Sequence, residues 1–180
     1  MSVPYEFKVL TPEEATALRS LQAKIGTANR LKGFHEEGTR LRALPQLLSG
    51  AHGAVGGILP SIVDKVTRLF PGLERNYWAA RLALITTEVA EAIEELRKGR
   101  RVDETWYSGG ALIPGLGLLE TDAIDYHDQP RKPEGVPSEV ADATIRSFDL
   151  ADEAKFDLAE IIDRKLHYNA TRPFMHGKKA

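Results

Sequence analysis

The chain has 180 residues, enough for one domain with a sizeable core. Its formal net charge of -2 excludes the broadly basic surface of proteins that bind nucleic-acid polymers. The absence of cysteine excludes disulfides, a thiolate nucleophile and cysteine-bound zinc. The N-terminal residues lack the basic and apolar regions of a signal peptide, so we expect a cytoplasmic protein.

The first half of the chain predicts three helices. Thr11, Pro12 and Glu14 form an N-cap, a first-turn proline and a capping box, which predicts a helix to about Arg30. Two shorter helices are expected over residues 40–48 and 61–70, the latter ended by Pro71-Gly72. The uncharged stretch 43–63 contains two prolines and four glycines, which favours a connection between helices and excludes a membrane span.

The second half predicts three further helices and an all-α fold. The strongest periodicity lies within residues 73–98, and Gly99 follows as a C-cap. Residues 100–136 are irregular and rich in Gly, Pro and Asp, with possible short strands near 111–119. Pro137 opens a helix to about Asp152, and the last helix covers 155–169, closed by Pro173.

Two pairs of carboxylates stand out on these helices. Glu88 and Glu91 are three residues apart, as are Glu139 and Asp142, so each pair shares one helix face. Four acids aimed into one cleft repel each other unless a hard cation with oxygen ligands, such as Mg²⁺, compensates them. The spacing therefore indicates a divalent metal site.

The neighbours of the acids support the first pair better than the second. Neither Glu88 nor Glu91 has a lysine or arginine four residues away, whereas Asp142 has Arg146 at that spacing. The helix that carries Glu139 is apolar on several sides, as expected of a buried helix. Solvated acids on charged helices remain the alternative for either pair alone.

A group of cationic and polar side chains ends the last predicted helix. Lys165, Tyr168 and Asn169 share one face, and Arg172 follows them. Such donors suit phosphate oxygens, although a basic helix end that complements the macrodipole is the alternative. The chain contains no P-loop, no dinucleotide fingerprint, no nucleophile elbow and no zinc spacing among its five histidines.

The chain resembles the MazG-like, all-α nucleoside triphosphate pyrophosphohydrolases. The resemblance covers about a third of the chain, with a fainter match over residues 29–34. Three segments carry it, LALITTEVAEAIEELRKG (82–99), KPEGVPSEVADATIRSFDLA (132–151) and DRKLHYNATRPFMHGKK (163–179).

The resemblance implies the roles of individual residues. It implies that the four acids bind Mg²⁺, for which Mn²⁺ can substitute. Of these acids we expect Glu91 to accept the proton of the attacking water as the catalytic base. It also implies that the triphosphate contacts a set of polar and cationic residues: Lys165, Tyr168, Asn169, Arg172 and, as a weaker candidate, Lys32. Many relatives carry a further acid where this chain has Thr87, which leaves the number of metal ions open.

The expected protein is a Mg²⁺-dependent hydrolase that converts a (deoxy)nucleoside triphosphate to its monophosphate and pyrophosphate. We expect one MazG-like domain over residues 1–180, with inserted segments at about 36–71 and 100–136. The site would be completed in a homodimer or homotetramer, with no polymeric nucleic acid and no membrane as partner. Phosphoribosyl-ATP pyrophosphohydrolase and a non-catalytic helical nucleotide-binding or regulatory protein are the alternatives. The preferred base and sugar and the pathway are left open.

Overall fold

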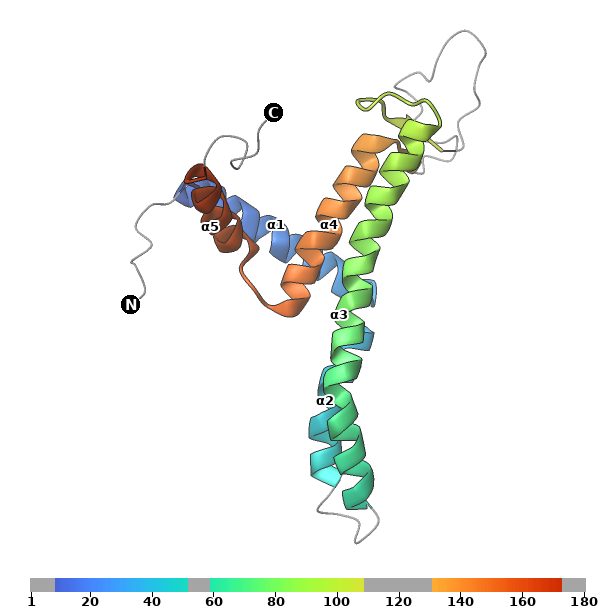
Figure 1. Cartoon of the computed structure of the whole chain (residues 1–180), viewed down its shortest axis with the longest axis vertical. Coiled ribbons are helices and arrows are strands. Elements are labelled where there is room, and N and C mark those ends of the chain that lie inside the picture. The colour runs from blue at the N-terminus through green and yellow to red at the C-terminus, as the bar shows by residue number, and fades with distance from the viewer. Residues whose placement is uncertain (1–8, 52–58, 109–130, 173–180) are drawn as a thin grey trace. The chain divides into compact units, whose positions relative to one another are not determined.

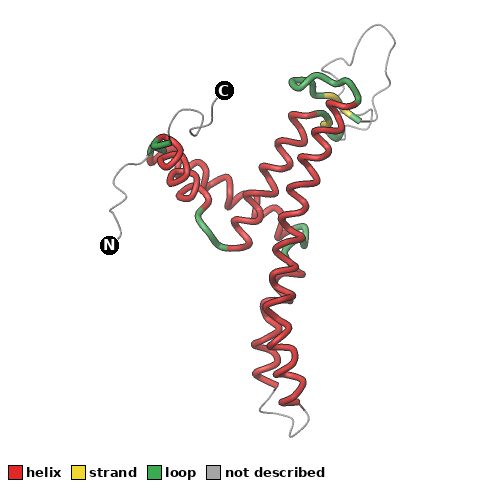
Figure 2. The backbone as a smooth tube through the Cα atoms, in the orientation of Figure 1, coloured by secondary structure: helices red, strands yellow, loops and turns green. Residues whose placement is uncertain are grey.

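The computed structural model describes residues 9–51, 59–108 and 131–172. These residues form five helices and a pair of two-residue strands, so the predicted all-α character is confirmed in its coarse form (Figure 2). The possible strands near 111–119 and the closing Pro173 lie outside the described residues. No described helix combines the length and the apolar character needed to cross a bilayer.

The chain divides into two compact units, and the division falls within α2 (Glu36–Ala51) and α4 (Val136–Ala154). The first unit contains residues 1–44 and 148–180, and the second contains residues 45–147. The expectation of one domain stays a prediction.

The first unit is built on α1 (Pro12–Leu31) and α5 (Leu158–Ala170), which pack against each other (Figure 1). The predicted capping box of α1 is confirmed, because Thr11 Oγ1 accepts from Glu14 N and Glu14 Oε2 accepts from Thr11 N. The two helices run antiparallel: Arg19 Nε lies 2.6 Å from Asp157 Oδ2, whereas the chain just before α1 binds Asp163 on α5.

Helix α4 ends against α1 at a position that only glycine allows. A Cβ built on Gly26 would lie 2.2 Å from Asp152 Cγ, far inside contact distance. The buried apolar side chains of this unit are Phe148, Ala151 and Ala159. The last helix begins at Leu158 with Asp157 as N-cap, three residues later than predicted from the pattern.

The second unit contains α3 (Leu59–Arg97), a 39-residue helix that corrects one prediction. Pro71-Gly72 was expected to end a helix, yet Pro71 lies inside α3 and the helix continues through it. A proline removes one N–H donor at a cost of about 3 kcal/mol, which lowers the stability of a long helix without forbidding it. The helix ends where predicted, and Gly99 adopts the positive φ of +82° typical of a glycine that closes a helix.

Within the second unit, α3 and the beginning of α4 lie side by side and antiparallel (Figure 1). Their ends are joined by β1 (Trp106–Tyr107) and β2 (Pro133–Glu134), which pair antiparallel. This small hairpin was not predicted, because two-residue strands leave no periodic pattern.

Gly135 connects β2 to α4 and has no tolerance for a side chain. Its φ is +102°, and a Cβ at this position would lie 2.4 Å from the carbonyl oxygen of Glu104. Its own carbonyl accepts from the backbone N–H groups of Ser138 and Glu139, which starts α4. The turn at Gly135 therefore sets the position of Glu139 relative to the hairpin.

Candidate metal site

Three of the four predicted acids come together between α3 and α4. One carboxylate oxygen from each of Glu88, Glu91 and Glu139 lies within 4.8 Å of the other two. Two oxygens that bind one Mg²⁺ lie at most about 4.2 Å apart, so small rotations of the side chains bring this set into range. We refer to these three residues as the acidic cluster.

The members of the acidic cluster differ in their exposure. Glu88 is 5% exposed and Glu139 is 3% exposed, whereas Glu91 faces solvent. Among the described residues, Glu139 Oε2 has no hydrogen-bond partner although it is buried. A buried carboxylate oxygen without a donor is costly, and a bound cation would remove that cost.

The pKa of Glu139 is consistent with a buried carboxylate that lacks a hydrogen-bond donor. Burial raises the pKa of this carboxyl above its ordinary value, and the negative charge of Glu91 raises it further. Asp142 and Glu88 add to the effect, while Lys132 opposes it. The site thus has an excess of negative charge at Glu139.

Arg146 corrects the expectation that the first acidic pair lacks a counter-charge. Its Nε contacts Glu88 Oε1 across the two helices, whereas the sequence spacing pointed to Asp142 as its partner. The i, i+4 rule concerns a single helix, so it could not reveal a partner on α3. Arg146 lies two turns after Glu139 on α4, which was the one available signal that it faces the same cleft.

Asp142 stays at the margin of the acidic cluster. It is half-buried, and its oxygens do not belong to the set within 4.8 Å. Its charge still raises the pKa of Glu139, so it lies near that carboxyl. Thr87, at the position where the resemblance to the MazG-like family led us to look for a further acid, donates its hydroxyl to the carbonyl of Ala83 at 3.1 Å.

Glu95 lies on the same face of α3 as Glu88 and Glu91, but both of its carboxylate oxygens accept hydrogen bonds from the protein. It accepts from Lys98 Nζ at 2.8 Å and from Trp106 Nε1 at 3.0 Å. These two hydrogen bonds, first that of Lys98 and then that of Trp106, lower the pKa of Glu95. Glu95 therefore joins the hairpin to the end of α3, where it helps to hold the two helices of the acidic cluster.

A shallow hollow of about 230 Å³ adjoins the buried side of Glu139. Apart from that carboxyl, its lining consists of small or apolar side chains and two hydroxyls: Val89, Ala92, Val140, Ala143, Thr144 and Ser147. The hollow gives the acidic cluster an apolar border, which strengthens charge interactions inside it.

The predicted phosphate-binding residues belong to the first unit. Lys165 Nζ lies 5.4 Å and Arg172 Cζ 5.8 Å from the ring centroid of Tyr168, so one aromatic ring contacts both cations. Asn169 is exposed next to them. The structure thus brings Lys165, Tyr168 and Arg172 together, with Asn169 beside them.

Lys32 does not join this group. It follows the end of α1, whereas the chain at the start of α1 binds Asp163, two residues before Lys165. A helix of 20 residues is about 30 Å long, so Lys32 and Lys165 are too far apart to share one phosphate group within a chain.

The acidic cluster fits a hard divalent cation by its chemistry. It offers carboxylate oxygens alone, two of them on buried residues and one on an exposed residue that leaves an open side. Such a set suits Mg²⁺ or Mn²⁺ better than zinc, which prefers nitrogen and sulfur ligands. Comparisons with protein-family models, with curated proteins and with solved structures found no match to this chain.

Proposed function

We propose that the protein is a Mg²⁺-dependent hydrolase of the MazG-like type that converts a (deoxy)nucleoside triphosphate to its monophosphate and pyrophosphate. The observation that carries the proposal is the acidic cluster with its buried, partnerless Glu139 oxygen. The resemblance of residues 82–99, 132–151 and 163–179 to that family supplies the substrate class.

The proposed role of each acid follows from its burial. Glu88 and Glu139 are buried between α3 and α4 and would bind the ion, with Asp142 completing the set after a change of rotamer. An ion held there would neutralise the phosphate chain and would lower the pKa of a water molecule. Glu91 is exposed at the open side, which suits it to accept the proton of that water.

The bond changes are those of an in-line displacement. The oxygen of water forms a bond to the α-phosphorus, and the bond from that phosphorus to the bridging oxygen of pyrophosphate breaks. The proton of the water goes to Glu91. Lys165, Asn169 and Arg172 would bind the leaving pyrophosphate, because cations stabilise the charge that builds on it.

Arg146 would take part through a change of partner. It forms an ion pair with Glu88, and a cation at Glu88 would release its guanidinium. The side chain of Arg146 is 41% exposed, so it can turn toward solvent and pair with phosphate oxygens in a bidentate manner. Metal and substrate would then bind in a coupled way.

A homo-oligomer is part of the proposal because α3 carries an uncovered apolar stripe. Leu82, Val89, Ile93 and Leu96 recur with helical spacing and are 47–53% exposed. In a helix of a monomeric protein such a stripe would face the core, and a second copy of the chain would bury it. Val89→Glu should give monomers in size-exclusion chromatography with light scattering, while Ala80→Glu on the opposite face should not.

The catalytic proposal is tested with a panel of nucleoside triphosphates and Mg²⁺. Monophosphate and pyrophosphate are expected as products, and Glu88→Gln should abolish their formation. Glu94→Gln is the matched control, because Glu94 lies on the same helix, is exposed and contacts Arg97 instead of the cluster. Release of orthophosphate alone, or activity that survives Glu88→Gln, would overturn the proposal.

A non-catalytic nucleotide-binding protein is the second candidate. The observation in its favour is the ion pair of Arg146 with Glu88, which compensates the charge of one acid of the cluster from within the protein. Nucleotide binding in calorimetry with no product in the same panel would favour this candidate.

A further inference from the structure

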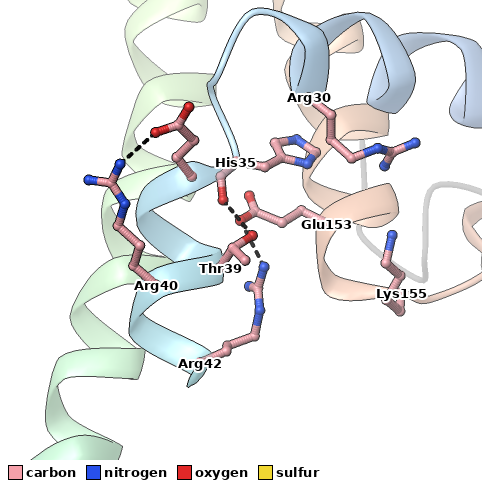
Figure 3. Close-up of a pocket in the computed structure, with 8 residues that line it drawn as sticks. Arg30, His35, Thr39, Arg40, Arg42, Glu153 and Lys155 are labelled. Atoms are coloured by element: carbon pink, nitrogen blue, oxygen red, sulfur yellow. Dashed lines mark hydrogen bonds and ion pairs between the residues drawn. The ribbon is translucent and has the colours of Figure 1, made fainter. Parts of the chain in front are cut away.

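A second charged pocket lies in the first unit, and none of the residues proposed above to bind metal or substrate lines it. Its volume is about 460 Å³, and its inner lining comes from three helices and the turns beside them (Figure 3). We call it the His35 pocket, defined by Arg30, His35, Thr39, Arg42, Glu153 and Lys155. Arg40 and Glu36, which form an ion pair with each other, complete its outer edge.

The floor of the pocket is an imidazole held in one orientation. His35 is 5% exposed, and its Nε2 lies 2.7 Å from Oδ1 of Asp149, which is 3% exposed. The carboxylate fixes the proton on Nε2 and leaves Nδ1 for another partner.

Cationic side chains reach the pocket from separate elements. Arg30 comes from α1, Arg42 from α2, and Lys155 directly follows α4 (Figure 3). Arg42 NH2 lies 3.3 Å from Oε1 of the buried Glu153, which orients the guanidinium beside the imidazole. Four cations and two carboxylates line the pocket, and Arg30 and Lys155 both contact Asp152, which lies just outside the lining.

Lys155 occupies a backbone conformation that does not suit lysine. Its φ is +62°, the left-handed region in which a glycine usually closes a helix. A residue other than glycine is strained there, and strained residues cluster at functional sites. The positive φ belongs to the cap of α4, because the backbone N–H groups of Lys155 and Phe156 donate to the carbonyls of Asp152 and Ala151. The lysine side chain is 71% exposed and reaches only a loose contact of 3.6 Å with Asp152, so the cap itself does not require a lysine.

We infer that the His35 pocket is a binding site for a phosphate monoester. Arg30, Arg42 and Lys155 bind the dianionic phosphate from different directions, since guanidinium and ammonium groups recognise phosphate by charge-assisted hydrogen bonds. The imidazole of His35 binds a polar group of the organic part through Nδ1. The volume exceeds that of a phosphate ion alone and lies in the range of small-molecule sites.

Binding in the His35 pocket needs no divalent metal, whereas the proposed hydrolysis does, so the two can be tested separately. Isothermal titration calorimetry on the full chain in EDTA removes any metal-dependent contribution. The probes are inorganic phosphate, ribose 5-phosphate and adenosine monophosphate. A tighter affinity for the esters than for phosphate identifies an organic ligand, whereas equal affinities identify the free anion as the source of the phosphate group.

Lys155→Gly is the decisive variant, because it should change affinity and stability in opposite directions. Loss of one charge-assisted contact should weaken binding about tenfold. Glycine relieves the strain at the positive φ, so the unfolding midpoint should rise. A lysine with a purely structural role would leave the affinity unchanged.

Two controls exclude trivial outcomes. Lys24→Gln removes the same charge from an exposed position of α1 and should leave the affinity unchanged. Lys155→Asn, which also tolerates a positive φ, should reproduce the loss seen with glycine. Absence of binding by every probe, or binding that responds to Lys165→Gln but not to Lys155→Gly, would overturn the inference.

Discussion

Buried carboxylates are treated differently in the two units. In the first unit, Asp163 Oδ1 accepts two backbone N–H groups at 2.7 Å, Asp149 pairs with His35, and Glu153 pairs with Arg42. In the second unit, Glu139 Oε2 is buried and has no partner among the described residues. Each of these acids of the first unit has a partner within the protein, although Glu153 Oε2, like Glu139 Oε2, is buried and accepts no hydrogen bond among the described residues. The acids differ in the charges beside them: Arg42 pairs with Glu153, whereas burial and the charges of Glu91, Asp142 and Glu88 raise the pKa of Glu139. A buried carboxylate that lies among other acids is therefore a better guide to a ligand site than a buried carboxylate as such.

The largest expected effect separates these two kinds of acid by activity. Glu139→Gln keeps the shape of the side chain and removes its charge, so we expect turnover to fall at least about 100-fold. Substrate-saturated rates with Mg²⁺ and with Mn²⁺ measure the loss. Glu160→Gln, at an exposed acid paired with Arg164, is the control and should keep full activity. Equal rates for Glu139→Gln and the parent protein would remove Glu139 from the site.

The next effect concerns stability and falls on the first unit. Asp163→Ala leaves the N–H groups of Val9 and Leu10 without their acceptor, which should cost about 2–4 kcal/mol of unfolding free energy. Urea denaturation measures this cost, and divalent cations should not alter it. A cost that depends on Mg²⁺ would contradict the division between self-satisfied and ligand-requiring acids.

When no metal is present, Glu139→Gln should stabilise the protein, whereas Asp163→Ala destabilises it. A carboxyl whose pKa is raised by folding binds its proton more tightly in the folded state, so stability falls as pH rises through that raised pKa. In EDTA the variant should therefore be more stable than the parent protein at pH 7, and the two should converge at acidic pH. Thermal unfolding from pH 4 to pH 8 measures both curves.

Glu95 gives that pH experiment an internal contrast. Its pKa is lowered by Lys98 and Trp106, so the stability that it contributes is lost as pH falls through the lowered pKa. Glu95→Gln should destabilise the protein near pH 7, where Glu139→Gln stabilises it. A shared sign for the two variants would show that burial, and not the missing partner, decides the behaviour of these acids.

The smallest expected effect concerns Arg146. Arg146→Gln removes the guanidinium that competes with a cation for Glu88, so Mn²⁺ should bind up to about fivefold more tightly without nucleotide. Nucleotide affinity in the presence of Mn²⁺ should fall. Electron paramagnetic resonance of free Mn²⁺ measures the first change and calorimetry the second. Loss of both affinities would assign Arg146 a role in folding only.

Local signals in the sequence predicted the helices well. The capping box at Thr11, the glycine after α3 and the proline near the start of α4 act within a few residues, and the corresponding helix ends are found where expected. The prediction failed at Pro71, where the loss of one hydrogen bond was taken to end a helix that continues for 26 residues beyond it. The helix that begins at Glu36 was predicted four residues too late.

Helix periodicity predicted which acids of one helix share a face, but it predicted no contact between helices. Spacing grouped Glu88 with Glu91 and singled out Glu139, and the structure brings these three together. It could not reveal contacts between elements distant in sequence, such as Arg146 with Glu88 or His35 with Asp149. Such partners depend on how the helices pack, which a single sequence does not encode in any local pattern.

The glycine that joins the hairpin to α4 has a consequence for genetics. In a saturation screen for function, position 135 should tolerate no replacement, because any side chain would collide with the Glu104 carbonyl and displace the helix that carries Glu139. Gly135, which has no functional group, would therefore score in that screen like a catalytic or metal-binding residue. A substitution at Gly135 and the loss of a metal ligand should both weaken metal binding. The substitution at Gly135 should also lower the melting temperature, and this fall distinguishes the two.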